Sequence, residues 1–185
     1  MNFIKTNIDG VIIVEPKIFK DSRGYFCETY NEQDFIKNGI PNRFVQDNQS
    51  QSSYGVVRGL HCQLGEHSQA KLVRVLHGTV LDVAVDVRVG SPTFGKYVAV
   101  ELSDKNMRQL FIPRDFLHGF SVLSESAIFA YKVDNFYNKE SEFGIRYDSP
   151  ELNIDWRIPA DKIITSDKDR IAHTLHDLIV KNRTR

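Results

Sequence analysis

Four polar side chains of different chemistry are concentrated in one strand-like segment of the chain. The segment places a guanidinium, an imidazole, an amide and an ammonium within fourteen residues, at Arg58, His61, Gln63 and Lys71. Charged side chains are rarely buried unless they are paired, so the segment is expected to line a polar site rather than to pack a core. Cations beside a histidine suit an anionic substrate that must lose or gain a proton.

Two further side chains could take part in proton transfer. His118 lies in a turn that returns into a strand-like stretch, and Tyr131 lies in the alternating stretch 129–133. Each also fits a structural role, as a hydrogen-bonded strand histidine or as an aromatic ring filling a barrel. A phenol can serve as a general acid or base where its hydroxyl faces a reacting carbon. His67 and His77 lack such neighbours and are interpreted as surface or structural residues.

A metal centre and nucleophilic catalysis find little support in the sequence. Small barrels often hold a metal through a His-x-His pair, but the corresponding residues here are His61-Cys62-Gln63, and no His-x-His occurs. Glutamine is a poor ligand for transition metals. There is no Gly-x-Ser-x-Gly and no glycine-rich phosphate loop, so arginine and lysine would have to contact a diphosphate. Cys27 and Cys62 are expected to be buried or half-buried thiols.

The spacing of Arg58 and His61 is at odds with their lining one pocket. Strict alternation along a strand places His61 and Gln63 on one face and Arg58 on the other. Gly59 could mark a β-bulge that re-aims Arg58. Otherwise Arg58 and His61 serve different parts of the pocket.

The composition of the whole chain excludes several classes of function. The 185 residues carry a formal net charge of +0, so no broad basic surface for nucleic acid or an anionic membrane is expected. No apolar run approaches the ~18 residues of a membrane span, and the first nine residues do not resemble a signal peptide. These features predict a cytoplasmic protein with no nucleic-acid and no membrane partner.

Short alternating segments separated by turn signals dominate the middle of the chain. In residues 79–87 the aliphatic side chains share one face, whereas Asp82 and Asp86 lie on the other. Residues 97–102, 108–112 and 127–133 show a similar pattern. Many short strands with regular turns between them predict an antiparallel sandwich or barrel.

Two helices are predicted outside these strands. Residues 32–38 begin after Asn31, a good N-cap, and end at Gly39. Residues 169–182 carry an apolar stripe formed by Ile171, Leu175, Leu178 and Ile179. The second segment is interpreted as an amphipathic surface helix without a site of its own.

Short segments spread over roughly residues 10–170 follow, in the same order, the motifs of a known protein family. The segments are 19–28, 44–50, 57–63, 70–75, 82–88, 91–95, 112–113, 118–120, 131–132, Tyr137, 142–145 and 166–169. Together they resemble the dTDP-4-dehydrorhamnose 3,5-epimerases, sugar-nucleotide epimerases of the cupin superfamily. The departures are Cys62, where an aromatic residue is expected, and Asp115-Phe116-Leu117, where Gly-Phe-Ala is commoner.

The resemblance implies a mainly β protein: a cupin-type jelly-roll barrel of antiparallel strands with a few short helices. Residues 1–185 would form one epimerase domain. Its jelly-roll core would span about 44–145, with an N-terminal arm at 1–43 and a C-terminal segment at 146–185 that ends in a helix. The resemblance also implies a homodimer in which the N-terminal arms reach the partner, and neither a metal nor an organic cofactor.

The resemblance further implies a reaction and residue roles. The substrate would be dTDP-4-dehydro-6-deoxy-D-glucose, epimerised at C3 and C5 to dTDP-4-dehydro-L-rhamnose in dTDP-L-rhamnose biosynthesis. His61 would remove both protons, Asp169 would hold its tautomer, and Tyr131 would be the acid on the opposite ring face. Lys71 would hydrogen-bond the C4 oxygen. Substrate contacts would come from Arg23, Glu28, Gln46, Asp47, Asn48, Arg58, His118, Tyr137, Glu142 and Lys168, with Arg23 and Glu28 serving the pocket of the partner.

Several alternatives share parts of this pattern. A relative that inverts only C3 or only C5, or that acts on another nucleotide sugar, would carry the same motifs. A sugar-nucleotide-binding barrel without activity would conflict with the intact His61, Lys71, Tyr131 and Asp169. A metal-dependent cupin oxygenase would require a bound metal.

Overall fold

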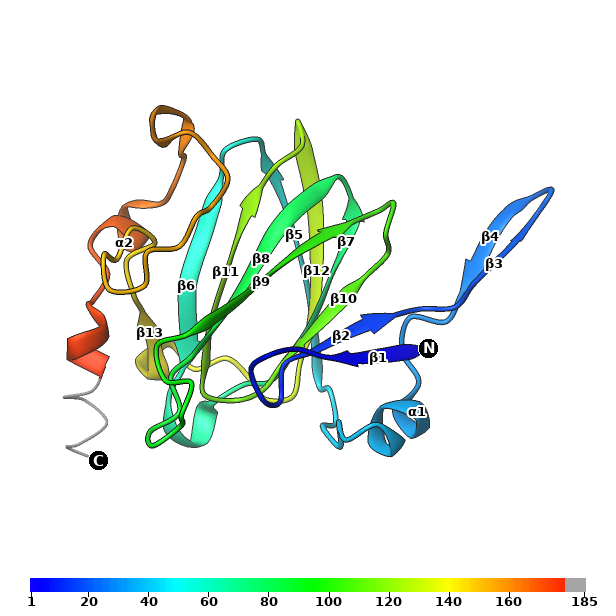
Figure 1. Ribbon diagram of the computed structural model, residues 1–185, viewed down its shortest axis with the longest axis horizontal. Coiled ribbons are helices and arrows are strands. Elements are labelled where there is room, and N and C mark those ends of the chain that lie inside the picture. The colour runs from blue at the N-terminus through cyan, green and yellow to red at the C-terminus, as the bar shows by residue number, and fades with distance from the viewer. Residues whose placement is uncertain (179–185) are drawn as a thin grey trace.

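Two antiparallel sheets that face each other form the body of the protein in a computed structural model that describes residues 1–178 (Figure 1). One sheet has the order β1-β2-β10-β7-β12-β5, and the other has the order β13-β6-β11-β8-β9. This arrangement confirms the predicted mainly β fold with few short helices. The bounds are β1 Asn2–Lys5, β2 Ile12–Glu15, β3 Ile18–Asp21, β4 Gly24–Cys27, α1 Glu32–Lys37, β5 Gln46–Ser53, β6 Val57–Gln63, β7 Lys71–His77, β8 Thr79–Asp86, β9 Tyr97–Ser103, β10 Gln109–Ile112, β11 Phe116–Val122, β12 Ser126–Val133, β13 Glu142–Gly144 and α2 Asp167–Arg170.

The strand β8 explains how the alternating pattern is used. Its inward positions Val80 and Ala84 belong to the core between the two sheets. Its other face, with Leu81 and Val83, packs into a second apolar cluster that includes Trp156 from the C-terminal segment. Successive strand side chains point to opposite faces, so both faces of β8 are buried. The four strand ranges predicted from alternation correspond to β8, β9, β10 and β12.

The predicted helix after Asn31 is confirmed. α1 spans Glu32–Lys37, and the Asn31 side chain accepts hydrogen bonds from the backbone N–H groups of Gln33 and Asp34. Its one buried side chain, Phe35, packs in a third cluster on the outer side of β2, β7 and β10. Burial of a phenylalanine stabilises a fold by roughly 1.5–3 kcal/mol, so this contact fixes the short helix against the sheet.

The predicted continuous helix over 169–182 is wrong. The helix α2 ends at Arg170, and His173 instead forms a parallel bridge with Ile145. A new helical turn begins after Thr174, and residues 179–182 lie outside the described part. The apolar stripe is also split, because Ile171 is 84% exposed whereas Leu178 is fully buried. Pairing next to β13 therefore overrides the helical periodicity of this segment.

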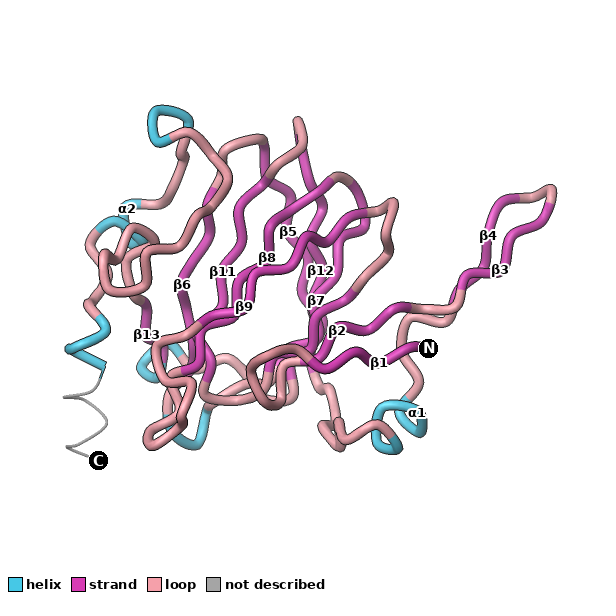
Figure 2. The backbone as a smooth tube through the Cα atoms, in the orientation of Figure 1, coloured by secondary structure: helices cyan, strands magenta, loops and turns pink. Residues whose placement is uncertain are grey.

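The hairpin of β3 and β4 projects away from the two sheets (Figure 2). Its register places Phe19 opposite Phe26. Phe19, Tyr25 and Phe26 are between 52% and 68% exposed. The hairpin therefore gathers three exposed aromatic side chains on one projecting element.

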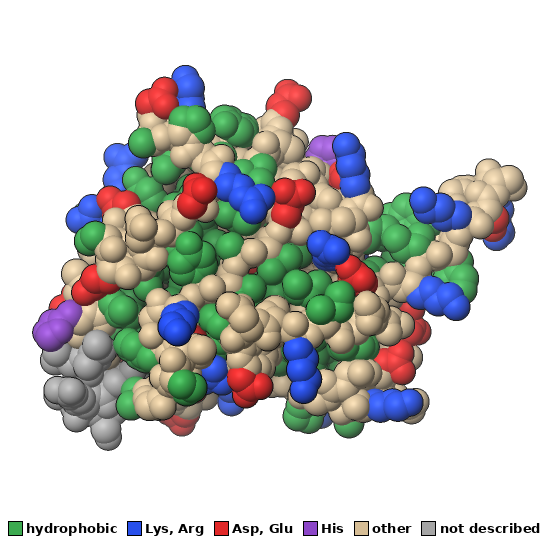
Figure 3. Space-filling model, in the orientation of Figure 1, with side chains coloured by type: hydrophobic (Ala, Val, Ile, Leu, Met, Phe, Trp, Pro, Cys, Tyr) green, Lys and Arg blue, Asp and Glu red, His purple; other side chains and the backbone are tan. Residues whose placement is uncertain are grey.

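The charged side chains on the face seen in Figure 3 are of both signs and interspersed, as the zero net charge leads one to expect. In the described part of the chain, no helix is long and apolar enough to cross a membrane.

Candidate active site

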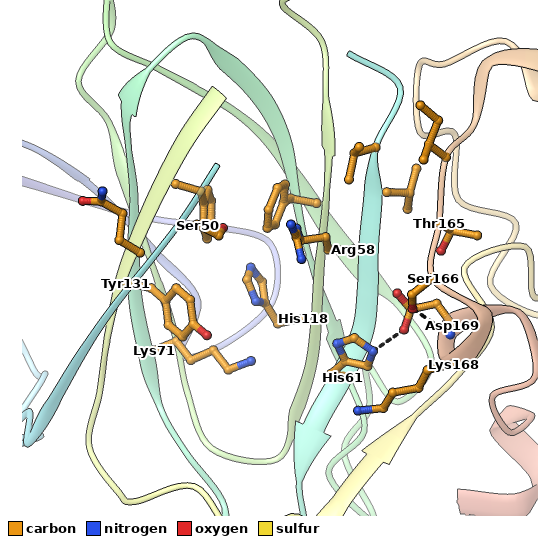
Figure 4. A pocket seen from close by; sticks show the side chains of 16 residues that line it. Ser50, Arg58, His61, Lys71, His118, Tyr131, Thr165, Ser166, Lys168 and Asp169 are labelled. Carbon is orange, nitrogen blue, oxygen red and sulfur yellow. Dashed lines mark hydrogen bonds and ion pairs between the residues drawn. The ribbon is translucent and has the colours of Figure 1, made fainter. Parts of the chain in front are cut away.

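A cavity of about 510 Å³ opens between the two sheets. Figure 4 shows its side chains, which come from β5, β6, β7, β11 and β12, from the segment that leads into α2 and from α2 itself. The lining residues are Gln49, Ser50, Val56, Val57, Arg58, His61, Lys71, His118, Phe120, Phe129, Tyr131, Ile164, Thr165, Ser166, Lys168 and Asp169.

A second cavity of about 240 Å³ shares His61, Lys71 and Tyr131 with the first. Its other lining residues are polar side chains together with one thiol. They are Gln46, Asn48, Cys62, Gln63, Gln69, Tyr137 and Glu142. The shared side chains therefore lie at the junction of one long, two-part binding space.

A β-bulge at Gly59 brings Arg58 and His61 into the same cavity, which confirms the predicted bulge. In the pairing of β6 with β11, His61 lies opposite His118 and Arg58 opposite Phe120, so one strand carries an extra residue. Gly59 has a φ of +114°, and a Cβ there would lie 2.6 Å from the Cα of Gly119. Only glycine tolerates both conditions, so this residue is required for the shape of the site.

His61 and Asp169 form a directly hydrogen-bonded pair. The His61 Nε2 lies 2.5 Å from the Asp169 Oδ1. Asp169 is 4% exposed and belongs to α2, whose first turn is capped by the side chain of Ser166. Burial works to raise the pKa of Asp169, but hydrogen bonds from His61 and Ser166 outweigh it and lower the pKa. A carboxylate that stays ionised fixes the Nε2–H tautomer and leaves Nδ1 as the basic nitrogen.

The segment before α2 is tied to the barrel by backbone contacts. Ile164 pairs with Val56 in a parallel bridge, and the Val57 N–H donates to the Ile164 carbonyl at 2.8 Å. A Cβ on Gly55 would lie 2.3 Å from the carbonyl oxygen of Lys162, which shows how closely the two segments approach. This contact places Asp169 next to His61, a residue 108 positions away in the sequence.

Lys71 and Tyr131 lie on strands of the six-stranded sheet, opposite His61. In Figure 4 the Lys71 ammonium lies between the Tyr131 hydroxyl and the His61 ring. Burial lowers the pKa of Lys71, and electrostatic interactions with Cys62, Asp82 and Glu142 act in the opposite direction. Burial also raises the pKa of Tyr131, with a smaller opposing effect of Arg58. The phenol is therefore kept protonated at neutral pH, as a proton donor must be.

Charged side chains also lie at the opening of the two-part binding space, beside β13. Lys168 forms an ion pair with Glu142, which also accepts a hydrogen bond from the Tyr137 hydroxyl at 3.0 Å. Burial works to raise the pKa of Glu142, but the contacts with Lys168 and Tyr137 outweigh it and lower the pKa. The Tyr137 side chain is itself exposed, so its ring is accessible for stacking on a planar ligand.

The structure gathers most of the predicted site residues. His61, Lys71, Tyr131, Asp169, Arg58, His118 and Lys168 line the larger cavity, and Gln46, Asn48, Tyr137 and Glu142 line the smaller one. Asp47 reaches neither cavity, because strand alternation turns it to the outer face of β5, where it pairs with Lys132 at 2.8 Å. Arg23 and Glu28 lie in or just after the projecting hairpin and line neither cavity.

Sequence reasoning missed several lining residues. Ser50, Phe120 and Phe129 are each two positions from a named motif residue, so alternation could have found them. Ile164 and Thr165 belong to an irregular segment for which no periodic signal exists. The Thr165 hydroxyl is buried and has no hydrogen-bond partner in residues 1–178, which makes it available to a ligand. No group of three or more His, Cys, Asp or Glu side chains in those residues could hold a metal ion.

A sequence model of the dTDP-4-dehydrorhamnose 3,5-epimerase family matches residues 5–177. The chain belongs to this family. It is 50% identical to the dTDP-4-dehydrorhamnose 3,5-epimerase of Escherichia coli over 97% of both chains. It is 36% identical to a dTDP-4-dehydrorhamnose 3-epimerase of Streptomyces niveus, over 89% of this chain and 80% of that one.

A solved structure of similar fold contains a ligand. It is the dTDP-6-deoxy-D-glucose-3,5-epimerase of Legionella pneumophila in complex with dTDP-4-keto-L-rhamnose. It is 51% identical to this family member, with a TM-score of 0.91 over 95% of this chain and 93% of that one. The likeness confirms the predicted cupin-type fold and the family resemblance found in the motifs.

Proposed function

We propose that the chain converts dTDP-4-dehydro-6-deoxy-D-glucose to dTDP-4-dehydro-L-rhamnose by inverting C3 and C5, in dTDP-L-rhamnose biosynthesis. One observation carries this proposal beyond family membership. His61, held by Asp169 of α2, lies on one sheet and faces Tyr131 on the other, and the Lys71 ammonium lies between His61 and Tyr131. Inversion at carbon requires a base on one face of the sugar ring and an acid on the other, and this arrangement supplies both.

In the proposed reaction each of these side chains has one step. His61 Nδ1 takes the proton from a carbon next to the C4 ketone, and Asp169 stabilises the imidazolium that forms. The electron pair moves onto the C4 oxygen to give an enolate, which accepts a hydrogen bond from Lys71. A preorganised donor to such an oxygen is typically worth about 3 kcal/mol. Tyr131 then returns a proton to the opposite face of the carbon. Exchange with solvent removes the proton from His61 and reprotonates Tyr131, and the same sequence at the second carbon completes the reaction.

The charged and planar groups at the cavity mouth suit the nucleotide diphosphate. Arg58 and Lys168 line the larger cavity and can neutralise phosphate oxygens, for which a planar guanidinium is well shaped. The exposed Tyr137 ring, held by Glu142, offers a stacking surface for the base. The cations therefore anchor the part of the substrate that does not react.

Deuterium incorporation tests the function. The protein is incubated with dTDP-4-dehydro-6-deoxy-D-glucose in deuterium oxide, and the sugar is followed by NMR. Deuterium at both C3 and C5, with a product that reduces to the L-rhamnose configuration, is expected. Label at one carbon would show a single-site epimerase, as in the Streptomyces relative named a 3-epimerase. No label would contradict an epimerase of this substrate.

Tyr131→Phe is expected to separate proton removal from inversion. The base His61 is untouched, so deuterium exchange at C3 and C5 continues, whereas inversion at one or both carbons slows by roughly 10²-fold because its proton donor is lost. NMR of exchange and of product configuration measures the two rates separately. Tyr54→Phe, in a turn outside both cavities, serves as the control. Unchanged inversion in Tyr131→Phe would contradict the role of the phenol.

We also propose that the chain forms a homodimer in which the N-terminal arm completes the partner's pocket. The exposed aromatic side chains of the hairpin support this, as does the position of Arg23, whose side chain is 87% exposed and pairs locally with Asp21. In its own chain Arg23 lines neither cavity. An arginine that contacts the substrate but lies outside its own pocket would act in a neighbouring one.

Mixed dimers test the arm exchange. Arg23→Ala and His61→Asn homodimers are each expected to be nearly inactive. After subunit exchange, half of the dimers are mixed, and each has one pocket with both residues intact, so about a quarter of the native activity returns. If the arm served its own chain, every pocket would keep one defect, and activity would not return after exchange has been verified by mass spectrometry.

A further inference from the structure

The most completely buried carboxylate near the cavity has no role in the chemistry described so far. Asp82 is 0% exposed and lies on the inward face of β8, between Val80 and Ala84 of the apolar core. An ionised carboxylate in such a place is strongly unfavourable unless other groups compensate it. An apolar residue at this position would pack without that cost, so the carboxylate calls for a functional explanation.

Asp82 holds a histidine that lines the cavity. The His118 Nε2 lies 2.9 Å from the Asp82 Oδ2, and His118 itself is 7% exposed. The register of β8 with β11 places Asp82 opposite Phe120 and Ala84 opposite His118, so the two side chains meet diagonally on the inward face. With Nε2–H donated to Asp82, the tautomer leaves Nδ1 of His118 as the free ring nitrogen.

The second oxygen of Asp82 remains uncompensated by any hydrogen bond. Asp82 Oδ1 has no hydrogen-bond partner within residues 1–178. The negative charge on this oxygen can therefore be compensated only by groups that do not touch it. Lys71 lies on β7 of the opposite sheet, and the two residues interact electrostatically. Titratable and charged groups facing Lys71 from the surrounding elements are His61 and Cys62 of β6, Asp82 of β8, His118 of β11, Tyr131 of β12 and Glu142 of β13.

We propose that Asp82 is a positioning residue that orients His118 by a direct hydrogen bond and acts by its charge on Lys71, the donor to the C4 oxygen. The inference rests on the proposed function, because it concerns the same enolate. Asp82 touches no substrate; it acts through His118, by their hydrogen bond, and on Lys71, by its charge. Glu142 also favours the charged ammonium but is engaged by the cation of Lys168. Asp82 pairs with no lysine or arginine within residues 1–178 and contacts His118 instead.

Asp82→Asn is expected to lower kcat by roughly ten- to a hundred-fold with KM changed less than about threefold, because the nucleotide contacts lie elsewhere. The pH profile provides the sharper readout. Burial lowers the pKa of Lys71 and Asp82 raises it, so removal of the carboxylate charge lets the pKa of Lys71 fall further. Lys71 then loses its proton at lower pH, and the basic limb of the kcat/KM profile moves toward neutral pH.

Asp86→Asn is the matched control. Asp86 lies on the same face of the same strand and is also 0% exposed, but its partners are Arg88, Ser91 and Thr93. This variant is expected to lose stability while its pH profile stays that of the native protein. A native-like kcat and an unmoved basic limb in Asp82→Asn would overturn the proposal and leave Asp82 a structural residue.

A measurement on the native protein keeps the proposal testable should Asp82→Asn fail to fold. With ¹⁵N-labelled histidine, His118 is expected to show the Nε2–H tautomer with an unprotonated Nδ1 at pH 8. A proton on Nδ1 instead would overturn the proposed orientation. Native protein that exchanges no deuterium would contradict the proposed function, whereas exchange by the native protein with an unaltered Asp82→Asn would contradict this inference alone.

Discussion

His61→Asn is expected to remove deuterium exchange at C3 and at C5 together. One histidine serves both carbons in the proposed reaction, so both rates fall by roughly 10²–10⁴-fold, the usual contribution of a general base. Asparagine is too short to replace the Nε2–H donor, but Asp169 keeps its hydrogen bonds with the Ser166 side chain and the Gly59 backbone, so the substitution does not leave that buried carboxylate without a partner. NMR in deuterium oxide measures exchange at the two carbons, and dTDP affinity is expected to stay close to that of the native protein.

The comparison with another histidine makes this result specific. His77→Asn is the matched control, because the His77 side chain is 61% exposed and lines neither cavity. It is expected to exchange both protons at the native rate. Full exchange in His61→Asn would contradict the assignment of the base, and loss at only one carbon would show that a second group removes the other proton.

The strands and the site side chains Arg58, His61 and Lys71 could be predicted from local patterns, whereas the role of Asp169 followed only from the family resemblance. Alternation marks β8 and β12 because successive strand residues point to opposite faces, and Asn31 marks α1 because its side chain caps the first turn. Gly59 could be interpreted as a bulge because His61 and Arg58 have incompatible parity on a regular strand. In each case the physical cause acts within a few residues.

The remaining features depend on contacts between distant segments. The helix expected over 169–182 is interrupted because His173 pairs with Ile145, a partner that helical periodicity does not reveal. Alternation places Asp82 on the strand face opposite its aliphatic neighbours. It does not reveal that this face points into the barrel, toward His118. Thr165 reaches the cavity through the bridge between Ile164 and Val56, which no local signal marks.

Lys71→Met is expected to lower the rate of enolate formation by roughly 10²–10³-fold, the effect of removing one preorganised donor to a developing oxyanion. Both carbons share the C4 oxygen, so exchange at C3 and at C5 should fall in parallel. Methionine retains much of the length of the lysine side chain and fills the cavity wall. Lys105→Met, at an exposed turn, is the control and should retain native exchange rates.

The same substitution is expected to leave the protein as stable as the native form or more stable. Burial lowers the pKa of Lys71 in the folded state, so the unfolded state binds the proton more tightly, and the charged lysine opposes folding at neutral pH. This cost is fully present below the folded-state pKa and declines as the pH rises through it. Methionine removes it, so thermal unfolding at pH 7 should show an unchanged or higher Tm beside the loss of activity. A large drop in Tm would instead mean that Lys71 supports the fold, and the activity loss could then not be attributed to the oxyanion contact.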